Sequence, residues 1–363
     1  MSKSKKNGRV ELLRFLFAMV ILFFHIQKRF SDEWITMWDD NVYFFNHGNI
    51  GVEFFFLVSG YLLAAGCYSK RDMPTDAMGT ETAKMMFKKL GHIFPYHLFA
   101  IIATIAVNAY CICETAAERY EYVLDSWASV FFVQIFGFES TWVNKLTWYL
   151  DVWLVGTMIF YYFLRKHYDV FVKIACPLLA LFILGYLDHE YQSLGGIDQW
   201  TGVFYKALLR GLAEMGLGCS AYSLTRELNK HSFTKAGHIA LGLLELFCYI
   251  IAFGYSCSDY DTTYQFLVLF IMCLGIILTF SNVNPGHKLF DHAIFPWLGK
   301  MSLLIYLNQF AIIRLVQEFM PDAGFALRAL VCVAGTFALS FVCDWLVGFL
   351  LKKKYLYRLF IEG

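Results

Sequence analysis

An arginine and a histidine, Arg14 and His25, lie eleven residues apart inside the first long apolar run of the sequence. On a helix their side chains are separated by about 20° around the axis and about 16 Å along it. Ionisable residues at membrane depth face protein or a water-filled cavity, and they are by default a hypothesis of function. Imidazole titrates near neutral pH and suits a base that takes a proton from a hydroxyl. His25 is therefore the candidate catalytic base, and Arg14 is the second catalytic candidate.

The composition is that of a membrane protein. Of 363 residues, 58% are hydrophobic and 16% are charged, which is more apolar than an ordinary soluble domain. The net charge of +1 provides no global basic field that would attract nucleic acid. Ten scattered cysteines are typical of small buried side chains rather than of a disulfide framework or a metal site, although a single bridge near Cys111 or Cys257 stays open. We expect one integral membrane domain over residues 1–363, without a metal or a tightly bound cofactor.

Apolar runs of spanning length predict an all-α, polytopic transmembrane bundle of about ten helices. The first run ends in basic residues rather than at a cleavage site, so we expect it to be a retained helix and not a signal peptide. A shorter run, 127–138, is expected to be interfacial or re-entrant. The ten runs are 10–30, 44–67, 90–112, 146–164, 171–187, 202–224, 238–255, 264–280, 293–316 and 325–351.

The distribution of Lys and Arg between the loops predicts the orientation. With the basic amino terminus inside, the loop 69–89 carries five Lys or Arg and the loop 225–237 carries three, whereas the loops 114–125, 188–198 and 256–261 are acidic or neutral. This asymmetry obeys the positive-inside rule. We therefore expect a multi-pass protein of the cytoplasmic membrane with both termini in the cytoplasm.

A second motif, Gly-Val-Glu-Phe-Phe-Phe-Leu-Val-Ser-Gly-Tyr at 51–61, follows in the next run. Its glycines allow close helix packing, and the Glu53 carboxylate needs a partner. The two motifs in this order resemble the membrane acyltransferase-3 family. Other segments that resemble it are Lys88-Lys89-x-x-His92-Ile93-x-Pro95-Tyr96, Trp148-Tyr149-Leu150, Arg210 with Gly216-x-Gly218, and Ser302-Leu303-x-Ile305-Tyr306-Leu307.

The resemblance implies an O-acyltransferase. Members take an acyl group, commonly acetyl, from cytoplasmic acyl-coenzyme A as co-substrate and transfer it to a hydroxyl of a cell-envelope or surface carbohydrate or glycolipid, often on the outer side. The implied partners are this donor, this acceptor and the membrane lipids, and the oligomeric state is not indicated. Two positions depart from the family pattern: Gln309 stands where many members carry a histidine, and His92 replaces an arginine. Neither position is assigned a catalytic role.

Coenzyme A carries phosphates, which arginine and lysine bind through charge-assisted hydrogen bonds. The candidates for binding the donor are Arg14, near the cytoplasmic third of the first helix, and Lys88 and Lys89, at the cytoplasmic mouth of the third. Each has a structural alternative. Arg14 could pair with Glu11 one turn earlier, and the topology alone predicts basic residues at 88 and 89.

A further polar set lies on the fourth and sixth helices. Lys206, Arg210 and Glu214 recur at four-residue spacing, so they form either a salt-bridge ladder or, with aromatic neighbours, a polar wall for an acceptor sugar. Glu53 could likewise lock the bundle by pairing with an arginine. The candidates for an acceptor site or a structural polar network are Glu53, Ser59, Trp148, Tyr149, Asp151, Arg210 and Tyr306.

Two other functions remain open at this stage. Buried Arg, His, Glu and Lys also build the pathways of transporters, although inverted repeats are not evident in the sequence. A sensor or inactive scaffold with the acyltransferase fold would account for Gln309. Transfer of acyl groups from acyl-coenzyme A indicates the enzyme, whereas flux of a polar metabolite or glycan without acyl consumption indicates the transporter.

Overall fold

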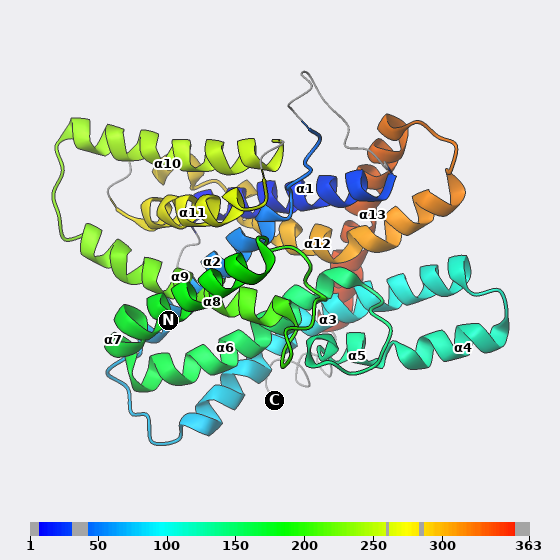
Figure 1. Ribbon diagram of the computed structural model, residues 1–363, viewed down its shortest axis with the longest axis horizontal. Helices are drawn as coiled ribbons and strands as arrows, with labels where there is room; N and C mark the ends of the chain where they lie inside the picture. The colour runs from blue at the N-terminus through cyan, green and yellow to red at the C-terminus, as the bar shows by residue number, and fades with distance from the viewer. Residues whose placement is uncertain (1–6, 31–42, 259–260, 283–286, 353–363) are drawn as a thin grey trace.

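The computed structural model describes residues 7–30, 43–258, 261–282 and 287–352, and these ranges are built almost entirely from helices (Figure 1). Within them β pairing is limited to isolated bridges, one of which joins Trp200 and Tyr205. The long helices are α1 (Gly8–Phe30), α2 (Ile50–Tyr68), α3 (Met78–Ile112), α6 (Trp148–Lys166), α8 (Cys176–Tyr191), α9 (Lys206–Leu228), α10 (Lys235–Ser256), α11 (Tyr264–Phe280), α12 (Ile294–Phe319) and α13 (Phe325–Lys352).

Short elements connect these helices. In the part of the chain that the structure describes, six candidate spans are long and apolar enough to cross a membrane: α1, α2, α3, the continuous stretch Tyr168–Tyr191, α10 and α13. The protein is therefore an all-helical, multi-pass membrane protein, and the number of crossings and the side of the termini stay predictions. The short elements are α4 (Ala116–Asp125), α5 (Trp127–Val130), α7 (Tyr168–Val170), the π-helical η3 (Phe171–Ala175), and the 3₁₀ turns η1 (Gln134–Phe136), η2 (Lys145–Thr147) and η4 (His287–Phe290).

Each of the ten predicted apolar runs overlaps one long helix, but two boundaries are wrong. Helix α3 begins at Met78, so much of the segment predicted as the loop 69–89 is helical and carries Lys88 and Lys89 at its third and fourth turns. The predicted run started only at residue 90 because polar residues precede it. In the structure those polar residues form the first turns of the same helix. Helix α2 begins at Ile50 rather than at residue 44.

The outer loop 114–125 is also helical, as α4. Its start is fixed by Thr115, whose hydroxyl oxygen accepts a hydrogen bond from the backbone N–H of Glu118 at 3.2 Å. The Glu118 carboxylate in turn accepts from the backbone N–H of Glu114 at 2.9 Å, and these hydrogen bonds lower the pKa of Glu118. This is the reciprocal pattern of a capping box, which stabilises a short helix without burial. The run 127–138 forms α5 and η1.

Helices α2 and α9 lie side by side at the centre of the molecule (Figure 1). They approach closely because Gly60 of α2 lies against the backbone of Met215, and Gly218 of α9 lies against the backbone of Leu57. A Cβ atom at either glycine would overlap a carbonyl oxygen of the facing helix. The two glycine-containing motifs of the sequence thus pack against each other, because small residues allow helices in a membrane to approach closely.

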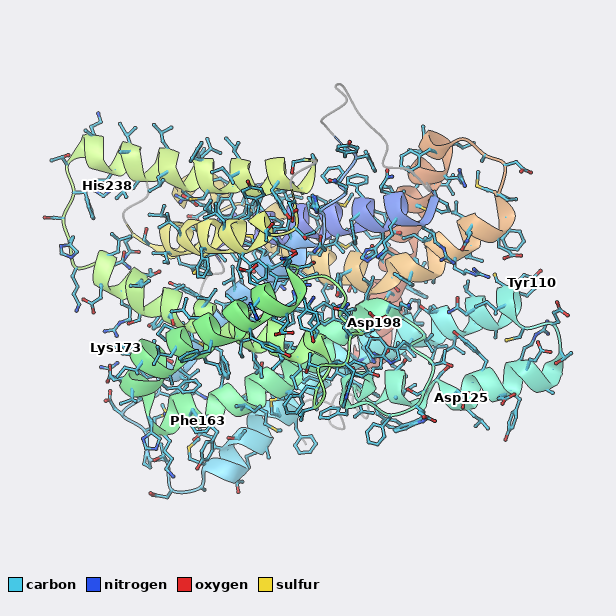
Figure 2. All side chains as sticks on the ribbon, in the orientation of Figure 1. Tyr110, Asp125, Phe163, Lys173, Asp198 and His238 are labelled. Atoms are coloured by element: carbon cyan, nitrogen blue, oxygen red, sulfur yellow. The ribbon has the colours of Figure 1, made fainter. Side chains whose placement is uncertain are left out.

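The remaining helices surround this central pair. Helix α1 packs mainly on α12, which also contacts α3 and α13, while α6 packs on α2 and α9. Phe163, Lys173 and His238 lie at one end of the molecule, and Tyr110 and Asp125 lie at the other (Figure 2). We call these the inner and the outer end, following the predicted orientation. Both α1 and α12 run from the inner toward the outer end, so each passes the whole depth of the bundle.

Candidate active site

Two cavities lie in series along α1 and α12. The inner cavity has a volume of about 400 Å³, and its lining includes Arg14, Ser59, Lys89, Tyr149 and Trp153. The outer cavity has a volume of about 800 Å³, and its lining includes His25, Lys28, Arg29, Trp148, Arg210 and Arg314. Val52 and Tyr306 line both cavities. A thin wall formed by these two side chains therefore separates the cavity of Arg14 from the cavity of His25.

The hydrogen bond of His25 fixes the tautomer of its ring. Nδ1 lies 2.8 Å from the carbonyl oxygen of Ile21. A carbonyl oxygen only accepts, so Nδ1 carries the proton, and Nε2 of the neutral ring is the nitrogen that can accept a proton. Phe310 of α12 packs edge-on against the ring with centroids 5.7 Å apart. The ring is thus oriented by the backbone and by packing, at the lining of the outer cavity.

Arg14 forms an ion pair with Glu11, which the sequence pattern offered as the structural alternative to donor binding. Arg14 also lines the inner cavity. Its Nη1 lies 3.4 Å from Oε2 of Glu11, one turn earlier. The Glu11 carboxylate reaches α12 because residue 299 is a glycine, and any larger side chain there would overlap it. The Arg14 side chain remains 29% exposed. The guanidinium is therefore anchored on one side and accessible on the other.

Lys88 and Lys89 lie on different faces of α3. The side chain of Lys89 lines the inner cavity, and its ammonium stands 4.7 Å from the centre of the Trp153 ring. Lys88 is exposed and is not part of the lining of either cavity. Successive residues of a helix point about 100° apart. The structure thus brings one of the two predicted lysines to Arg14 and leaves the other at the surface.

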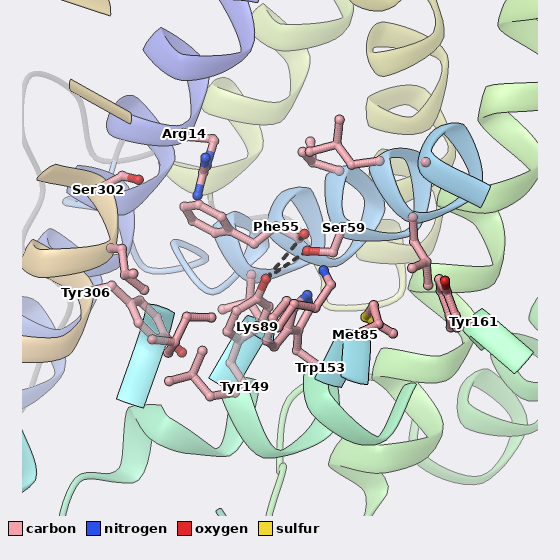
Figure 3. Close-up of a pocket in the computed structure, with 18 of the residues that line it drawn as sticks. Arg14, Phe55, Ser59, Met85, Lys89, Tyr149, Trp153, Tyr161, Ser302 and Tyr306 are labelled. Atoms are coloured by element: carbon pink, nitrogen blue, oxygen red, sulfur yellow. Dashed lines mark hydrogen bonds between the residues drawn. The ribbon is translucent and has the colours of Figure 1, made fainter. Parts of the chain in front are cut away.

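Ser59 and Tyr149, predicted with the acceptor group, line the inner cavity together with Arg14 and Lys89 (Figure 3). The Ser59 hydroxyl and the Tyr149 hydroxyl are 3.1 Å apart, and the Tyr149 hydroxyl also lies 3.4 Å from the carbonyl oxygen of Phe55. Tyr149 can donate to that carbonyl while it accepts from Ser59. These bonds fix two hydroxyls in the inner cavity near the wall.

Arg210 is the centre of a buried cluster between α2, α9 and α11. Its Nη2 lies 2.6 Å from Oε1 of Glu53, and its Nε lies 2.8 Å from Oε1 of Glu214. Gln265 of α11 donates to the same Glu53 oxygen at 2.6 Å. Arg210 also donates to the carbonyl oxygen of Leu194 at 3.1 Å. The guanidinium side chain is 2% exposed, so this cluster is mainly an internal tie between helices.

Comparison with known proteins agrees with this architecture. A family model for an acyltransferase domain matches residues 7–345, nearly the whole chain. This chain belongs to the acyltransferase-3 family. No curated protein and no solved structure gives a significant match. The family resemblance found in the motifs at 14–25 and 51–61 is thereby confirmed, and both motifs line or adjoin the two cavities of this acyltransferase-3 protein.

Several other predicted residues also have defined places in this acyltransferase-3 protein. Tyr306, which forms part of the wall, donates to the carbonyl oxygen of Leu146 at 2.7 Å. Trp148 lines the outer cavity, and the Arg210 guanidinium lies 5.5 Å from its ring centre. Among the described residues, no salt bridge joins Lys206 to the carboxylate of Glu214; the Lys206 ammonium instead donates to the Gln199 side-chain oxygen at 3.3 Å. The predicted ladder is therefore one pair, Arg210 with Glu214.

Asp151 does not join that cluster. One of its carboxylate oxygens accepts from the backbone N–H of Gln134 at 3.1 Å and from the Gln134 amide at 3.4 Å. Asp151 is fully buried and lies on the lining of neither cavity. It holds η1, and hence the segment around residues 127–138, against the first turn of α6. The spacing of Asp151 on its own helix gave no sign of this partner.

Sequence reasoning missed the ion pair that closes the inner end. Arg165 of α6 lies just beyond the predicted apolar run 146–164, yet its side chain is 1% exposed and its Nε lies 3.0 Å from Oε1 of Glu81. The Tyr161 hydroxyl donates to the same carboxylate at 2.5 Å, and Arg165 also donates to the carbonyl oxygen of Lys70. Tyr161 and Lys70 both line the inner cavity. This network therefore fixes the mouth of that cavity.

Gln309, which replaces the late histidine of many acyltransferase-3 proteins, is fully buried near His25. Its amide interacts with the His25 ring and donates to the carbonyl oxygen of Tyr306 at 3.1 Å. All ten cysteines are free, and eight of them are buried. Among the described residues, no group of three His, Cys, Asp or Glu side chains gathers as a metal site would require.

Proposed function

We propose that this protein is an integral membrane O-acyltransferase of the cytoplasmic membrane, which moves an acyl group from acyl-coenzyme A to a hydroxyl of a cell-envelope or surface carbohydrate or glycolipid. Acetyl is the acyl group that we would test first. The observation that carries the proposal is the pair of cavities divided by Val52 and Tyr306. Arg14 and Lys89 suit an anionic donor in the inner cavity, and His25 suits a base in the outer one.

The donor enters from the inner end in this proposal. Arg14 and Lys89 bind phosphates of coenzyme A, because both cations line the inner cavity and charge-assisted hydrogen bonds to phosphate are strong. The apolar remainder of that lining, including Phe55, Leu62 and Ile93, accommodates the less polar arm that ends in the thioester. The thioester is then held at the wall, near the hydroxyls of Ser59 and Tyr149.

The acceptor binds in the outer cavity, which is twice as large. Nε2 of His25 takes the proton of the acceptor hydroxyl, whose oxygen attacks the thioester carbonyl carbon. A carbon–oxygen bond forms, the carbon–sulfur bond breaks, and the proton leaves with the thiol of coenzyme A. Small displacements of Tyr306 and Val52 would join the two cavities for this step. Incubation of the enzyme with labelled acyl-coenzyme A in the absence of acceptor tests whether the acyl group first resides on His25, because a covalent acyl-enzyme would retain the label.

The test uses purified protein in lipid with radiolabelled acetyl-coenzyme A and pooled envelope glycans. Wild type should transfer label, and a folded His25→Ala protein should not. Folding of the variant is checked by its thermal unfolding, since removal of a buried polar group can destabilise a protein by itself. Wild-type activity in folded His25→Ala protein rejects His25 as the base. Flux of a glycan across vesicles without consumption of the acyl donor would indicate a transporter instead.

A further inference from the structure

The outer cavity has a strong excess of positive charge. Its lining includes the cations Lys28, Arg29, Lys145 and Arg314, in addition to Arg210, which Glu53 and Glu214 already neutralise. The carboxylate among the lining residues is that of Asp198, which is exposed. A cavity for a neutral sugar needs hydrogen-bonding groups and aromatic faces, but it does not need four cations.

Arg29 of α1 and Arg314 of α12 form the centre of this positive charge. Arg29 Nε donates to Oε1 of Gln317 at 2.6 Å, and Arg314 Nη1 donates to the same oxygen at 3.0 Å. Two guanidinium groups thus converge on one neutral oxygen atom. The nearest carboxylate that forms a salt bridge with them, Glu318, lies 3.7 Å from Nη2 of Arg314 and is 43% exposed. Two guanidinium groups held this close repel each other, and an anion bound between them would offset the repulsion with charge-assisted hydrogen bonds.

The topology does not account for these cations. Lys28, Arg29 and Arg314 lie near the outer ends of α1 and α12, whereas basic residues of membrane proteins gather on the cytoplasmic side. At the inner end a lysine such as Lys88 needs no other explanation. At the outer end, cations that face a cavity require one, and Lys28 and Arg29 follow His25 by a single turn of the same helix.

We propose that the acceptor is an acidic carbohydrate, whose phosphate or carboxylate group binds between Arg29 and Arg314 while one of its hydroxyls reaches His25. This inference rests on the proposed function and specifies its acceptor class. Arg29 and Arg314 are specificity-determining residues that bind the anion, and they take no part in the chemical step. Both a sugar phosphate and a uronic acid carry such an anionic group beside a free hydroxyl, so both belong to this acceptor class.

The test is a binding titration on full-length protein in nanodiscs of uncharged phosphatidylcholine. Glucose 1-phosphate represents the phosphate, glucuronic acid represents the carboxylate, and glucose is the neutral control. We expect at least one of the two acids to bind, its affinity to fall as salt rises, and glucose to bind at least tenfold more weakly. Arg29→Gln and Arg314→Gln should each weaken the acid by about tenfold or more, because each removes one charge-assisted hydrogen bond.

Arg328→Gln is the matched control. Arg328 belongs to the same end of the molecule and donates to the carbonyl oxygen of Phe30 at 3.5 Å, but it is not part of the cavity lining. Its substitution should leave binding unchanged, and Arg29→Lys should keep part of the affinity because it keeps the charge. If glucose 1-phosphate binds far more tightly than glucuronic acid, the acidic group of the acceptor is a phosphate. If glucuronic acid binds more tightly, it is a carboxylate.

Three results overturn the inference: failure of both acids to bind up to about 10 mM, equal binding of glucose, or unchanged binding in Arg29→Gln and Arg314→Gln. Because none of these titrations contains an acyl donor, acid binding without transfer from any acyl-coenzyme A would count against the proposed function while leaving the anion site intact.

Discussion

Two arginines inside the helix bundle, Arg14 and Arg210, differ in how completely their charge is satisfied. Arg210 is 2% exposed and is held by Glu53, Glu214 and the carbonyl oxygen of Leu194. Arg14 has one salt bridge, to Glu11 at 3.4 Å, and the rest of its side chain faces a cavity. A fully paired buried charge ties helices together, whereas a half-paired charge at a cavity is available to a ligand.

The same contrast separates the two halves of the polar interior. The cluster around Arg210 contains two carboxylates for one arginine and fixes α2, α9 and α11 to one another. The two groups along α1 each line a cavity: Arg14 is paired with Glu11, and His25 is bonded to the Ile21 carbonyl and contacts the Gln309 amide. We therefore expect substitutions around Arg210 to act on stability and substitutions along α1 to act on transfer.

The largest effect on activity is expected for His25→Ala. Loss of a general base lowers the rate of transfer by about 10²–10⁴-fold. The unfolding temperature should fall only slightly, because the ring bonds to the Ile21 carbonyl and the Gln309 amide but makes no salt bridge among the described residues. Steady-state transfer of radiolabelled acetyl and thermal unfolding in the same detergent measure the two quantities. A large loss of stability with activity retained in the folded fraction would mean that His25 is a structural residue like Arg210, and would contradict the distinction between the two regions.

Arg210→Met tests the other side of the comparison. The substitution leaves the carboxylates of Glu53 and Glu214 buried without their cation, so we expect a loss of about 3–5 kcal/mol in the free energy of unfolding. Unfolding in mixed detergent micelles measures this loss. Arg14→Met is the matched control and should cost less than Arg210→Met, because Arg14 is 29% exposed and makes a single, longer ion pair, at 3.4 Å to Glu11, among the described residues. Equal destabilisation by the two substitutions would contradict the distinction between them.

Arg14→Gln should act on donor binding. Removing one charge-assisted bond to a phosphate raises the KM for acyl-coenzyme A by about tenfold to a hundredfold, with kcat changed much less. Arg14→Lys should recover part of the affinity. The KM for the acceptor is measured in parallel and should stay constant. A change confined to the acceptor KM would exclude Arg14 from the donor site.

The smallest of these effects is expected for two adjacent lysines. Lys89→Gln should raise the KM for acyl-coenzyme A by about three- to tenfold, because Lys89 faces the inner cavity beside Trp153. Lys88→Gln should leave it unchanged, because Lys88 points to the surface. Titration of coenzyme A by calorimetry gives the same comparison without turnover. Equal effects of the two substitutions would mean that their charge acts at a distance and not by contact.

The periodic parts of this protein could be predicted from its sequence. Long apolar runs specify membrane helices because the backbone must satisfy its own hydrogen bonds in lipid, and the two motifs with their spacing were enough to indicate the family. The sequence also placed Arg14 and His25 on one face of one helix. That face lines both cavities in the structure, since α1 runs past the whole depth of the bundle.

Only the tertiary structure decided which partners the polar groups have. Glu53 meets Arg210 and Gln265 across 157 and 212 residues of sequence, Asp151 binds Gln134 instead of joining them, and Arg165 closes the inner cavity with Glu81. Such pairs depend on how helices rotate and approach, which the glycines at 60 and 218 control through close packing. Helix periodicity gives the face of a residue, but the identity of the facing side chain is a property of the assembled bundle.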